Sequence, residues 1–597
     1  QEPKDIPDTV MQASAAAARS MALLAKARGT RVRTKTYPPE RDLADEPPRV
    51  GVFVCHCGSN IASVVDVARV VAHAKTLPHV AWADSNTYTC ADDSQDRMKQ
   101  AIREHRLNRV VVASCTPRTH APLFQATIRE VGLNRFLFEL ADIREQCSWC
   151  HMHDNDNATR KATEIVNMTV AKTRRLLPVT SASVGVDRNA LVLGGGIAGM
   201  TAALSLVEQG YGVHLVEAAE TLGGLLTKVR RNLEGDDVAA FLAATIARVL
   251  QNPRITVHLG TAIDKIDGFV GNFVTTLTSG QEVRHGAILV ATGGVEYQPV
   301  EYGYGDSPQV ITQRQLENLL AAEGPRNDGT YVMVQCVGSR EEPNNYCSRI
   351  CCQDALKNAI AIKERAPQAT VVVLYRDMRA YGLKEDYYRR ARDLGVLFFL
   401  YTPENKPRVE PLGDKVSVSF PSAVLGREMR VDADWLVLST GLRARPDGEE
   451  LAKKLKLTCN LDGFLLEAHV KLRPVDFPSE GLFLAGLAHA PKNLEETIGQ
   501  ALAAAGRAGA LLSHDSLTVS GVISKHNRAI CMSCLACVKK CPFGAPFIDS
   551  DGRVSHNEVK CTGCGICAGV CPAKAYQVNY FRDDQLLAMI DSVTVMA

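Results

Sequence analysis

The sequence predicts a multidomain α/β protein with a cysteine-rich domain at its C-terminal end. Two cysteine runs of identical spacing lie near the C-terminus. A glycine-rich turn stands between a strand-like and a helix-like segment at residues 194–199. Apolar strand-like runs alternate with helix-like stretches over residues 49–178 and again over 188–513. Such alternation is typical of parallel sheets that are covered by helices.

The two cysteine runs predict two [4Fe–4S] clusters in a domain that spans residues 521–597. Each run has the spacing C-x₂-C-x₂-C-x₃-C-P. Bacterial two-cluster ferredoxins have this spacing, and the fourth cysteine of each run binds the cluster of the other run. Zinc sites normally use two separate pairs of ligands instead of two unbroken quartets. We therefore assign one cluster to Cys531, Cys534, Cys537 and Cys571, and the other to Cys561, Cys564, Cys567 and Cys541.

The glycine-rich turn predicts a dinucleotide site in a domain that spans residues 179–520. A strand at 189–193 leads into the turn, a helix follows it, and Glu217 stands after the next strand. The glycines permit a tight turn and bring a pyrophosphate close to the helix N-terminus, while Glu217 would bind ribose hydroxyls. A Gly-Gly-Leu segment follows at 223–225. The expected cofactor-binding residues here are Gly194, Gly196, Ile197, Ala198, Gly199, Glu217, Gly224 and Leu225.

Two later segments indicate FAD instead of a simple NAD-binding unit. Ala291, Thr292 and Gly293 end a strand and resemble the Ala-Thr-Gly strand of two-dinucleotide flavoproteins. The segment 481–486, which ends at Gly486, resembles the part of thioredoxin-reductase-like enzymes that closes over the flavin. A helix is expected from about residue 493, and its positive N-terminus would favour the anionic reduced flavin. We therefore expect a thioredoxin-reductase-like two-dinucleotide FAD fold.

The middle of this domain, residues 326–428, is expected to be a degenerate second nucleotide subdomain. Its first strand runs into Gln335-Cys-Val-Gly-Ser339 instead of a three-glycine loop, so binding of a nicotinamide nucleotide is not expected. Cys347, Cys351 and Cys352 stand near a helix start, where the helix dipole and a neighbouring arginine would stabilise a thiolate. The sequence leaves three roles open: a cluster ligand, a redox-active thiol, or packing. Two further thiols, Cys336 and Cys459, are interpreted as structural.

Residues 49–178 predict an N-terminal α/β domain whose cysteines gather at one edge of a parallel sheet. Strands are expected at 49–54, 109–114 and 135–140, with a helix at 92–105, and a cysteine follows each strand. The carboxyl ends of parallel strands form the binding crevice of such sheets. We therefore predict a third [4Fe–4S] cluster instead of ordinary buried thiols. The expected ligands are Cys57, Cys90, Cys115 and Cys147, with Cys55 and Cys150 as alternatives.

Residues 1–48 are expected to form a helix and a linker. Residues 3–24 resemble residues 491–512 near the end of the flavin domain. Alanine-rich helices can match by chance, but the shared Pro-Lys opening and Gln-Ala pair favour a true repeat. We interpret the segment as resembling the tail of a preceding flavin domain. The matched pairs include Lys4 and Lys492, Thr9 and Thr497, Gln12 and Gln500, Arg19 and Arg507, and Leu24 and Leu512.

Composition narrows the class of protein further. The 68 basic and 66 acidic side chains nearly cancel, so neither a nucleic acid nor an anionic membrane is expected as the main partner. Many of the 19 cysteines are clustered at ligand spacings, which indicates metal binding in a reducing compartment instead of a disulfide scaffold. No apolar run reaches the ~18 residues that a transmembrane helix needs. We expect a cytoplasmic protein.

Several of these motifs together resemble HdrA, the FAD and iron–sulfur subunit of the heterodisulfide reductase (Hdr) complexes. The resemblance covers about residues 49–580. It is carried by Cys55-His-Cys-Gly58, Ala113-Ser-Cys-Thr-Pro-Arg118, Ile143-Arg-Glu-Gln-Cys-Ser-Trp149, Gln335-Cys-Val-Gly-Ser-Arg340, Tyr346-Cys-Ser-Arg-Ile-Cys-Cys352, Glu467-Ala-His-Val-Lys-Leu-Arg-Pro474 and Pro491-Lys492.

The resemblance implies an oxidoreductase subunit that performs flavin-based electron bifurcation. Its FAD would receive electron pairs from a hydrogenase or dehydrogenase and divide them between a low-potential ferredoxin-type acceptor and a high-potential disulfide-type acceptor. The implied partners are B- and C-like disulfide-reducing subunits, a small iron–sulfur adaptor and ferredoxin, in a dimeric assembly.

The resemblance also implies a catalytic and cofactor-binding role for Lys492, beside N5 of the flavin. A lysine there can hydrogen-bond the flavin and tune its proton and charge balance. The alternative is a solvated lysine at a helix start, a position where the helix dipole disfavours positive charge.

One departure from the family pattern affects the expected electron route. Methanogen members carry an additional ferredoxin module between the Gly-Gly-Leu loop and the Ala-Thr-Gly strand, but residues 226–286 contain no cysteine. We expect the C-terminal ferredoxin domain to serve in its place. Two alternatives to bifurcation stay open. One is an electron-relay subunit of a quinone-interacting or benzoyl-CoA-reductase-type complex, and the other is a scaffold with a vestigial flavin.

Overall fold

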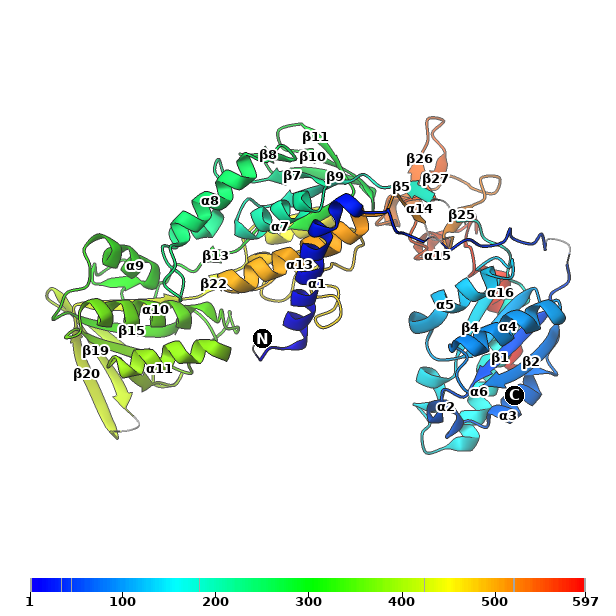
Figure 1. Cartoon of the computed structure of the whole chain (residues 1–597), viewed down its shortest axis with the longest axis horizontal. Helices are drawn as coiled ribbons and strands as arrows, with labels where there is room; N and C mark the ends of the chain where they lie inside the picture. The colour runs from blue at the N-terminus through cyan, green and yellow to red at the C-terminus, as the bar shows by residue number, and fades with distance from the viewer. Residues whose placement is uncertain are drawn as a thin grey trace. The chain divides into compact units, whose positions relative to one another are not determined.

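The computed structural model describes residues 3–33, 35–43, 46–181, 183–422, 425–518 and 521–594. Its contacts divide the chain into two compact units (Figure 1). One unit contains Gly185–Leu517 together with the N-terminal helix α1 (Ile6–Leu23). The other contains Val32–Val184 together with the segment that begins at Thr518. None of the described helices is long and apolar enough to cross a bilayer.

The second unit begins with the predicted parallel α/β domain. Its sheet has the strand order β2-β1-β3-β4, and every pair of neighbours is parallel. The valine-rich strands β1 and β3 are fully buried because helices cover both faces of the sheet. The expected strands and the helix at 92–105 are confirmed, although the last strand begins three residues later than predicted. The elements are β1 (Val50–Cys55), α2 (Ser59–Ala62), α3 (Val67–Ala74), β2 (Val80–Asn86), α4 (Asp92–Glu104), β3 (Arg109–Ser114), α5 (Pro117–Arg129), β4 (Phe138–Asp142), η2 (Arg144–Ser148) and α6 (Asn155–Thr173).

The same unit contains the cysteine-rich domain, which is built from two similar halves. In each half a short helix begins after the second cysteine and contains the third. The strands pair as β25 with β28 and β26 with β27. A last helix packs on α6 of the N-terminal domain, where the Asn167 amide donates a hydrogen bond to the Ser592 carbonyl at 2.8 Å. The elements are β25 (Ser524–His526), α14 (Ala536–Lys540), β26 (Pro546–Ile548), β27 (Val554–His556), α15 (Ile566–Val570), β28 (Tyr576–Val578) and α16 (Asp583–Thr594).

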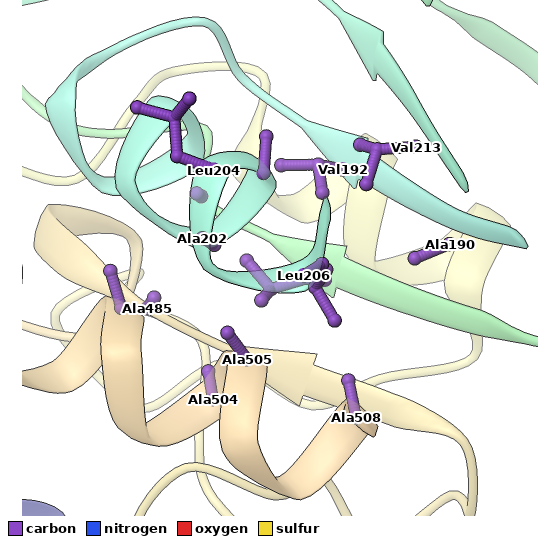
Figure 2. Close-up of a cluster of buried hydrophobic side chains, with 14 of the residues drawn as sticks. Ala190, Val192, Ala202, Leu204, Leu206, Val213, Ala485, Ala504, Ala505 and Ala508 are labelled. Atoms are coloured by element: carbon purple, nitrogen blue, oxygen red, sulfur yellow. The ribbon is translucent and has the colours of Figure 1, made fainter. Parts of the chain in front are cut away.

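The first unit contains a five-stranded parallel sheet of order β23-β12-β6-β7-β8. The strands β9 to β11, which follow β8 in the chain, form a separate antiparallel sheet. The helices α7 (Ile197–Glu208) and α13 (Leu494–Leu512) pack together largely through small side chains. Figure 2 shows Ala504, Ala505 and Ala508 of one helix facing Ala202 and Leu206 of the other. The elements are β6 (Asn189–Leu193), α7 (Ile197–Glu208), β7 (Gly212–Val216), η3 (Gly224–Lys228), α8 (Val238–Leu250), β8 (Ile255–His258), β9 (Ile263–Phe269), β10 (Asn272–Leu277), β11 (Glu282–His285), β12 (Ala287–Val290), β13 (Val295–Glu296), β22 (Leu442–Arg443), α12 (Gly448–Leu455), β23 (Leu482–Leu484), η5 (Gly486–Ala488) and α13 (Leu494–Leu512).

A second copy of this plan lies within the same unit. Its parallel sheet has the order β14-β21-β15-β16-β17, and it too is accompanied by three antiparallel strands. The sheet extends beyond residues 326–428 because β14 and β21 flank that range. The elements are β14 (Val310–Thr312), α9 (Gln313–Ala322), β15 (Thr330–Val337), α10 (Ile350–Arg365), β16 (Thr370–Tyr375), η4 (Gly382–Lys384), α11 (Glu385–Asp393), β17 (Leu397–Leu400), β18 (Arg408–Leu412), β19 (Lys415–Ser422), β20 (Arg427–Ala433) and β21 (Trp435–Thr440).

Candidate flavin and iron–sulfur sites

The glycine-rich turn has the geometry that a pyrophosphate site requires. A Cβ on Gly199 would lie 1.8 Å from the Gly194 carbonyl oxygen, so only glycine allows α7 to start this close to β6. In contrast, a Cβ on Gly196 would meet no atom within 4 Å. The chain therefore leaves open space above Gly196 at the N-terminus of α7, beside Ile197 and Ala198. This is where a helix N-terminus favours a phosphate.

Glu217 is held beside this turn at the end of β7. Its carboxylate accepts hydrogen bonds from the Gly195 amide at 2.6 Å and from the Ala219 amide at 2.8 Å. The Gly-Gly-Leu segment lies against the same turn, since the Gly223 amide donates to the Gly195 carbonyl at 2.9 Å. The turn, the acid and the Gly224–Leu225 segment therefore meet at one end of the sheet.

The Ala-Thr-Gly segment and Gly486 reach the same place from distant parts of the chain. The Ala291 amide donates to the Leu193 carbonyl at 2.8 Å, and Thr292 and Gly293 continue past the glycine turn. No atom lies within 4 Å of a Cβ built on Gly293. Gly486 has a positive φ of 73°, and its Cβ would lie 2.8 Å from that of Ala198. The structure thus brings the predicted nucleotide residues together, with open space above two of the glycines.

Lys492 is a buried residue just before α13. Its side chain is 7% exposed, and its Nζ donates to the carbonyl oxygens of Gly486 at 3.1 Å and Ala490 at 2.9 Å. Burial lowers the pKa of its ammonium group to about 7, although the carboxylate of Glu496 acts in the opposite direction. The alternative of a solvated lysine is wrong. A buried amine that titrates near neutrality is suited to proton exchange.

A hydrogen-bonded chain connects this region to Glu467, and the sequence alone did not predict it. The Glu467 carboxylate lies 3.0 Å from His489 Nε2, and His489 Nδ1 lies 2.9 Å from the Gln500 amide nitrogen. Gln500 Oε1 in turn accepts from the Gly486 amide at 2.8 Å. The only sequence signal was the position of Glu467 at the start of the 467–474 motif. The chain fixes the loop that presents Gly486 and Lys492.

The cysteines of the C-terminal domain line two cavities. No three His, Cys, Asp or Glu side chains in the described part of the chain form a group that could hold a single metal ion. Four thiols around a cavity fit a polynuclear cluster instead. Each cavity takes three cysteines from one run and the fourth from the other. The first is lined by Cys531, Cys534, Cys537 and Cys571, and the second by Cys561, Cys564, Cys567 and Cys541.

Backbone amides donate to sulfurs of both sets, as expected for groups that bind as thiolates. The Ala575 amide donates to Cys571 Sγ at 3.2 Å, and the Ser524 amide donates to Cys561 Sγ at 3.3 Å. Leu535 and Gly565 have positive φ values of 63° and 78° at equivalent positions, immediately before the short helices of the two runs. The two halves therefore share one ligand-loop conformation.

The N-terminal cysteines lie just past the ends of the parallel strands, as predicted. Arg144 Nη1 donates to Cys57 Sγ at 3.1 Å, and its charge also acts on the thiols of Cys90 and Cys115. Cys55 Sγ accepts from the amides of Cys57 at 3.2 Å and Thr89 at 3.4 Å. Three thiols are therefore grouped around one guanidinium, and Cys55 lies beside Cys57 and Cys90.

The other two candidates of this domain face a different direction. Cys147 Sγ donates to the Ala158 carbonyl of α6 at 3.1 Å, and burial raises the pKa of its thiol to about 11. Cys150 is exposed, and its Sγ donates to the Glu145 carbonyl at 3.1 Å. In this conformation neither thiol is directed at Arg144.

Another group of thiols lies in the second nucleotide subdomain. Cys351 and Cys352 hydrogen-bond each other, and Cys336 and Cys347 are close enough to act electrostatically on Cys351. The Arg349 amide donates to Cys347 Sγ at 3.3 Å. The sequence alone gave no reason to group Cys336 with the other three. The fold places Cys336 with the other three thiols because the end of β15 lies beside the start of α10.

Tyr297 fills the space above Gly338, in the loop that would hold a phosphate in this subdomain. A Cβ on Gly338 would lie 2.1 Å from the ring of Tyr297. The Arg340 side chain pairs with Asp377 at 2.6 Å and lines an open cavity of about 510 Å³ together with Arg376 and Arg379. The absence of nicotinamide binding stays a prediction, and the contact of Tyr297 with Gly338 supports it.

Comparison with known proteins agrees with the fold and the two kinds of site. Residues 188–328 match the family of pyridine nucleotide-disulphide oxidoreductases, and residues 530–576 match the 4Fe-4S dicluster domain. The fold and sites define an FAD- and iron–sulfur-containing oxidoreductase. A thioredoxin reductase structure from T. acidophilum aligns with 55% of this chain and 98% of that chain, at 14% identity and a TM-score of 0.38.

The curated relatives narrow the class to one family. The chain is 35% identical to the iron-sulfur A subunit of the CoB--CoM heterodisulfide reductase of Methanocaldococcus jannaschii, over 92% of this chain and 98% of that protein. It is 34% identical to the A subunit of the H(2):CoB-CoM heterodisulfide,ferredoxin reductase of Methanothermobacter thermautotrophicus, over 92% and 97%. The chain belongs to this family of heterodisulfide reductase A subunits (HdrA), and its cofactors are FAD and [4Fe–4S] clusters.

Proposed function

We propose that this protein receives electron pairs on its FAD and distributes them by electron bifurcation to a low-potential and a high-potential acceptor. FAD exchanges electrons in pairs or singly, whereas iron–sulfur clusters exchange them singly. The observation that carries the proposal is the conjunction of a nucleotide turn, a buried lysine whose pKa is about 7 and two four-thiol cavities in one chain.

The relatives' names support two acceptors. The Methanothermobacter thermautotrophicus relative is named for H(2), the CoB-CoM heterodisulfide and ferredoxin. A Methanococcus maripaludis relative, 34% identical over 92% of this chain, is named for H(2)/formate and the same two acceptors. We propose equivalent partners here: a hydrogenase or dehydrogenase as donor, B- and C-like disulfide-reducing subunits with a small iron–sulfur adaptor, and ferredoxin. The dimeric state and the cytoplasmic location belong to the same proposal.

In the proposed site each group has a defined task. The turn at Gly194–Gly199 and the α7 N-terminus would hold the pyrophosphate, and Glu217 the ribose. Lys492 would stand beside the flavin ring and exchange one proton near neutral pH. Glu467, His489 and Gln500 would position the loop that carries it.

We propose that the chain binds more clusters than the two in its C-terminal domain. One belongs at Cys57, Cys90, Cys115 and Cys147, with Cys55 as the nearest substitute because it lies beside Cys57 and Cys90. Binding through Cys147 requires its side chain to turn from Ala158. A further cluster belongs at Cys336, Cys347, Cys351 and Cys352, where the fold groups four thiols within the flavin unit.

A redox titration of the bound FAD tests the bifurcation proposal. We expect crossed potentials, with the second electron entering at a higher potential than the first, so that absorbance passes directly from oxidised to fully reduced flavin. A flavin that takes up its two electrons in well-separated steps would instead favour the relay subunit of a quinone-interacting or benzoyl-CoA-reductase-type complex.

A further inference from the structure

The N-terminal helix α1 is a second copy of α13. Residues 3–24 are identical to residues 491–512 at 12 of 22 positions. The copies also share local structure, since each helix is capped by a short polar side chain at the equivalent position. The Asp5 carboxylate accepts from the backbone amide of Asp8, and the Asn493 side chain accepts from that of Glu496, both at 2.8 Å. The match is therefore one of sequence and of helix start together.

The two copies pack against each other with equivalent residues in contact. Ala18 is the equivalent of Gly506, and a Cβ on Gly506 would lie 3.1 Å from that of Ala18. Asp8 is the equivalent of Glu496. Burial and the neighbouring carboxylates of Asp5 and Glu496 raise the pKa of Asp8. The carboxyl groups of Asp8 and Glu496 are therefore close to each other. The helices run side by side in Figure 1. Contacts between equivalent residues are characteristic of an isologous, twofold-related interface.

The outer face of α1 keeps side chains that α13 buries inside its own flavin domain. Gln500 is 1% exposed because its carbonyl oxygen accepts from the flavin-loop residue Gly486. Its equivalent, Gln12, is exposed. Leu512 is fully buried, whereas its equivalent Leu24 is 63% exposed. The same contrast holds for Thr497 and Thr9, and for Ala504 and Ala16.

A helix that stays in solvent gains no stability from exposing these side chains. Alanines and leucines that match a domain interior, together with a glutamine that matches a loop-binding residue, indicate a surface that is buried in an assembly. The twofold-like contact identifies what would bury it. A domain related to this one by the α1–α13 pseudo-symmetry would cover the outer face of α1, as the flavin domain here covers α13.

We propose that the outer face of α1 docks a second FAD-binding domain of the same fold, in which α1 occupies the place that α13 has here. Lys4 then stands where Lys492 stands in the first domain, at the edge of a second flavin site. Two flavins would be brought into one assembly by a pair of equivalent helices. The inference goes beyond the proposed function, and it rests on that function only in assuming that this fold binds FAD.

The flavin content of the native assembly tests the proposal. The assembly is purified through a tag on this chain, and acid-released FAD is counted per copy of the chain. We expect two FAD molecules per copy. One FAD per copy would overturn the second domain while leaving the proposed function intact. An assembly without FAD would overturn the proposed function itself.

A matched pair of substitutions localises the second flavin. Ala16 is exposed on the outer face of α1, and Ala244 is exposed on α8. Ala16→Arg places a long charged side chain where the second domain would pack, so we expect FAD per chain to fall twofold, with peptides of the second domain lost in mass spectrometry. The control variant Ala244→Arg should keep two FAD molecules per chain. Retention of two FAD by Ala16→Arg, or loss of both, would contradict docking on α1.

Discussion

At the scale of single residues, Lys492 is governed by the cost of placing a charge in the protein interior. Burial lowers the pKa of the amine to about 7, and the nearby Glu496 carboxylate limits the shift. That carboxylate is shared, because it also accepts from Arg349 at 3.3 Å. Below the lowered pKa the side chain is an ammonium group, and above it a neutral amine. Its charge therefore changes over the neutral pH range.

This change of charge predicts how the flavin potential depends on pH. A positive charge beside the flavin stabilises its anionic reduced form, so the loss of that charge above pH 7 should lower the midpoint potential. From pH 6 to pH 8 the potential should fall more steeply in the native protein than in Lys492→Met. At pH 6 the variant should be lower by at least ~30 mV, which is about 1.4 kcal/mol for a two-electron couple. Spectroelectrochemical titration measures both effects.

The control for this experiment is Lys265→Met, which removes a lysine that is 67% exposed in β9. It should leave the potential and its pH dependence unchanged. Parallel pH profiles of the native protein and Lys492→Met would show that Lys492 does not act on the flavin.

The glycine turn gives a second prediction, which separates folding from cofactor binding. Gly199→Ala forces a methyl group to within 1.8 Å of the Gly194 carbonyl, so both the thermal stability and FAD binding should be lost. Gly196→Ala meets no protein atom within 4 Å, so the FAD-free protein should keep its melting temperature. FAD affinity should still fall at least about tenfold, because the methyl group occupies the space that a pyrophosphate needs.

Thermal unfolding of FAD-free protein and fluorescence titration with FAD measure the two quantities. Equal damage by both substitutions would contradict the assignment of the space above Gly196.

Sequence alone predicted residues whose role follows from local backbone geometry. The turn glycines are of this kind, since their positions relative to strand and helix are set within about ten residues. The burial of Lys492 and the Glu467–His489–Gln500 chain could not be predicted, because they depend on segments that meet only in the folded domain. The crossed cysteine sets are an intermediate case. Their spacing predicted the exchange, and the folded chain places the corresponding thiols around common cavities.

At the scale of elements, helix α6 carries a buried lysine that connects the N-terminal domain to the C-terminal segment. Lys172 pairs with Glu139 of β4 at 2.6 Å, and its side chain is 4% exposed. Its ammonium group also lies 4.3 Å from the ring centre of Tyr580 and 4.1 Å from that of Phe581. Two aromatic rings and one carboxylate therefore share a single cation, which α6 and the chain before α16 hold between them.

Removal of this cation should destabilise the unit strongly. Lys172→Met leaves the half-buried Glu139 carboxylate without its cation, at a cost of up to about 3–5 kcal/mol. Differential scanning calorimetry should show a lower transition temperature for the unit that contains α6 and α16. The double variant Lys172→Met/Glu139→Gln removes the unpaired charge and should recover part of the loss. A single variant as stable as the native protein would show that the pair contributes little.

The strand–helix alternation predicted both parallel sheets of the nucleotide-binding unit, but not the full membership of the second one. β14 and β21 lie outside residues 326–428, and pairing between strands so distant in sequence leaves no local signal. The four-thiol group is hidden for the same reason. Cys336 lies near the end of β15, and the other three thiols lie just before or in the first turn of α10, so only the fold shows that they are neighbours.

At the scale of the whole molecule, the chain contains groups suited to paired and to single electrons. The nucleotide-binding unit holds the FAD turn and the group of thiols at Cys336–Cys352. The other unit holds both the N-terminal cysteines and the C-terminal cavities. Residues 226–286 contribute no cysteine, so the proposed transfer of single electrons from the flavin would use clusters on other segments. The number of clusters therefore decides how many one-electron routes exist.

Iron content distinguishes the possible cluster sets. Each [4Fe–4S] cluster carries four irons, so the C-terminal domain alone gives about 8 irons per chain. The N-terminal site raises the total to about 12, and the thiols of the second nucleotide subdomain raise it to about 16. We expect about 16 irons per chain in anaerobically purified protein.

Two substitutions test the additional sites. Cys115→Ser and Cys352→Ser should each lower the iron total by about four and each remove a different electron paramagnetic resonance signal. Cys459→Ser, at a half-buried thiol apart from all these groups, should lose none. A full iron complement in Cys115→Ser would exclude the N-terminal cluster, and one in Cys352→Ser would exclude the cluster beside the flavin.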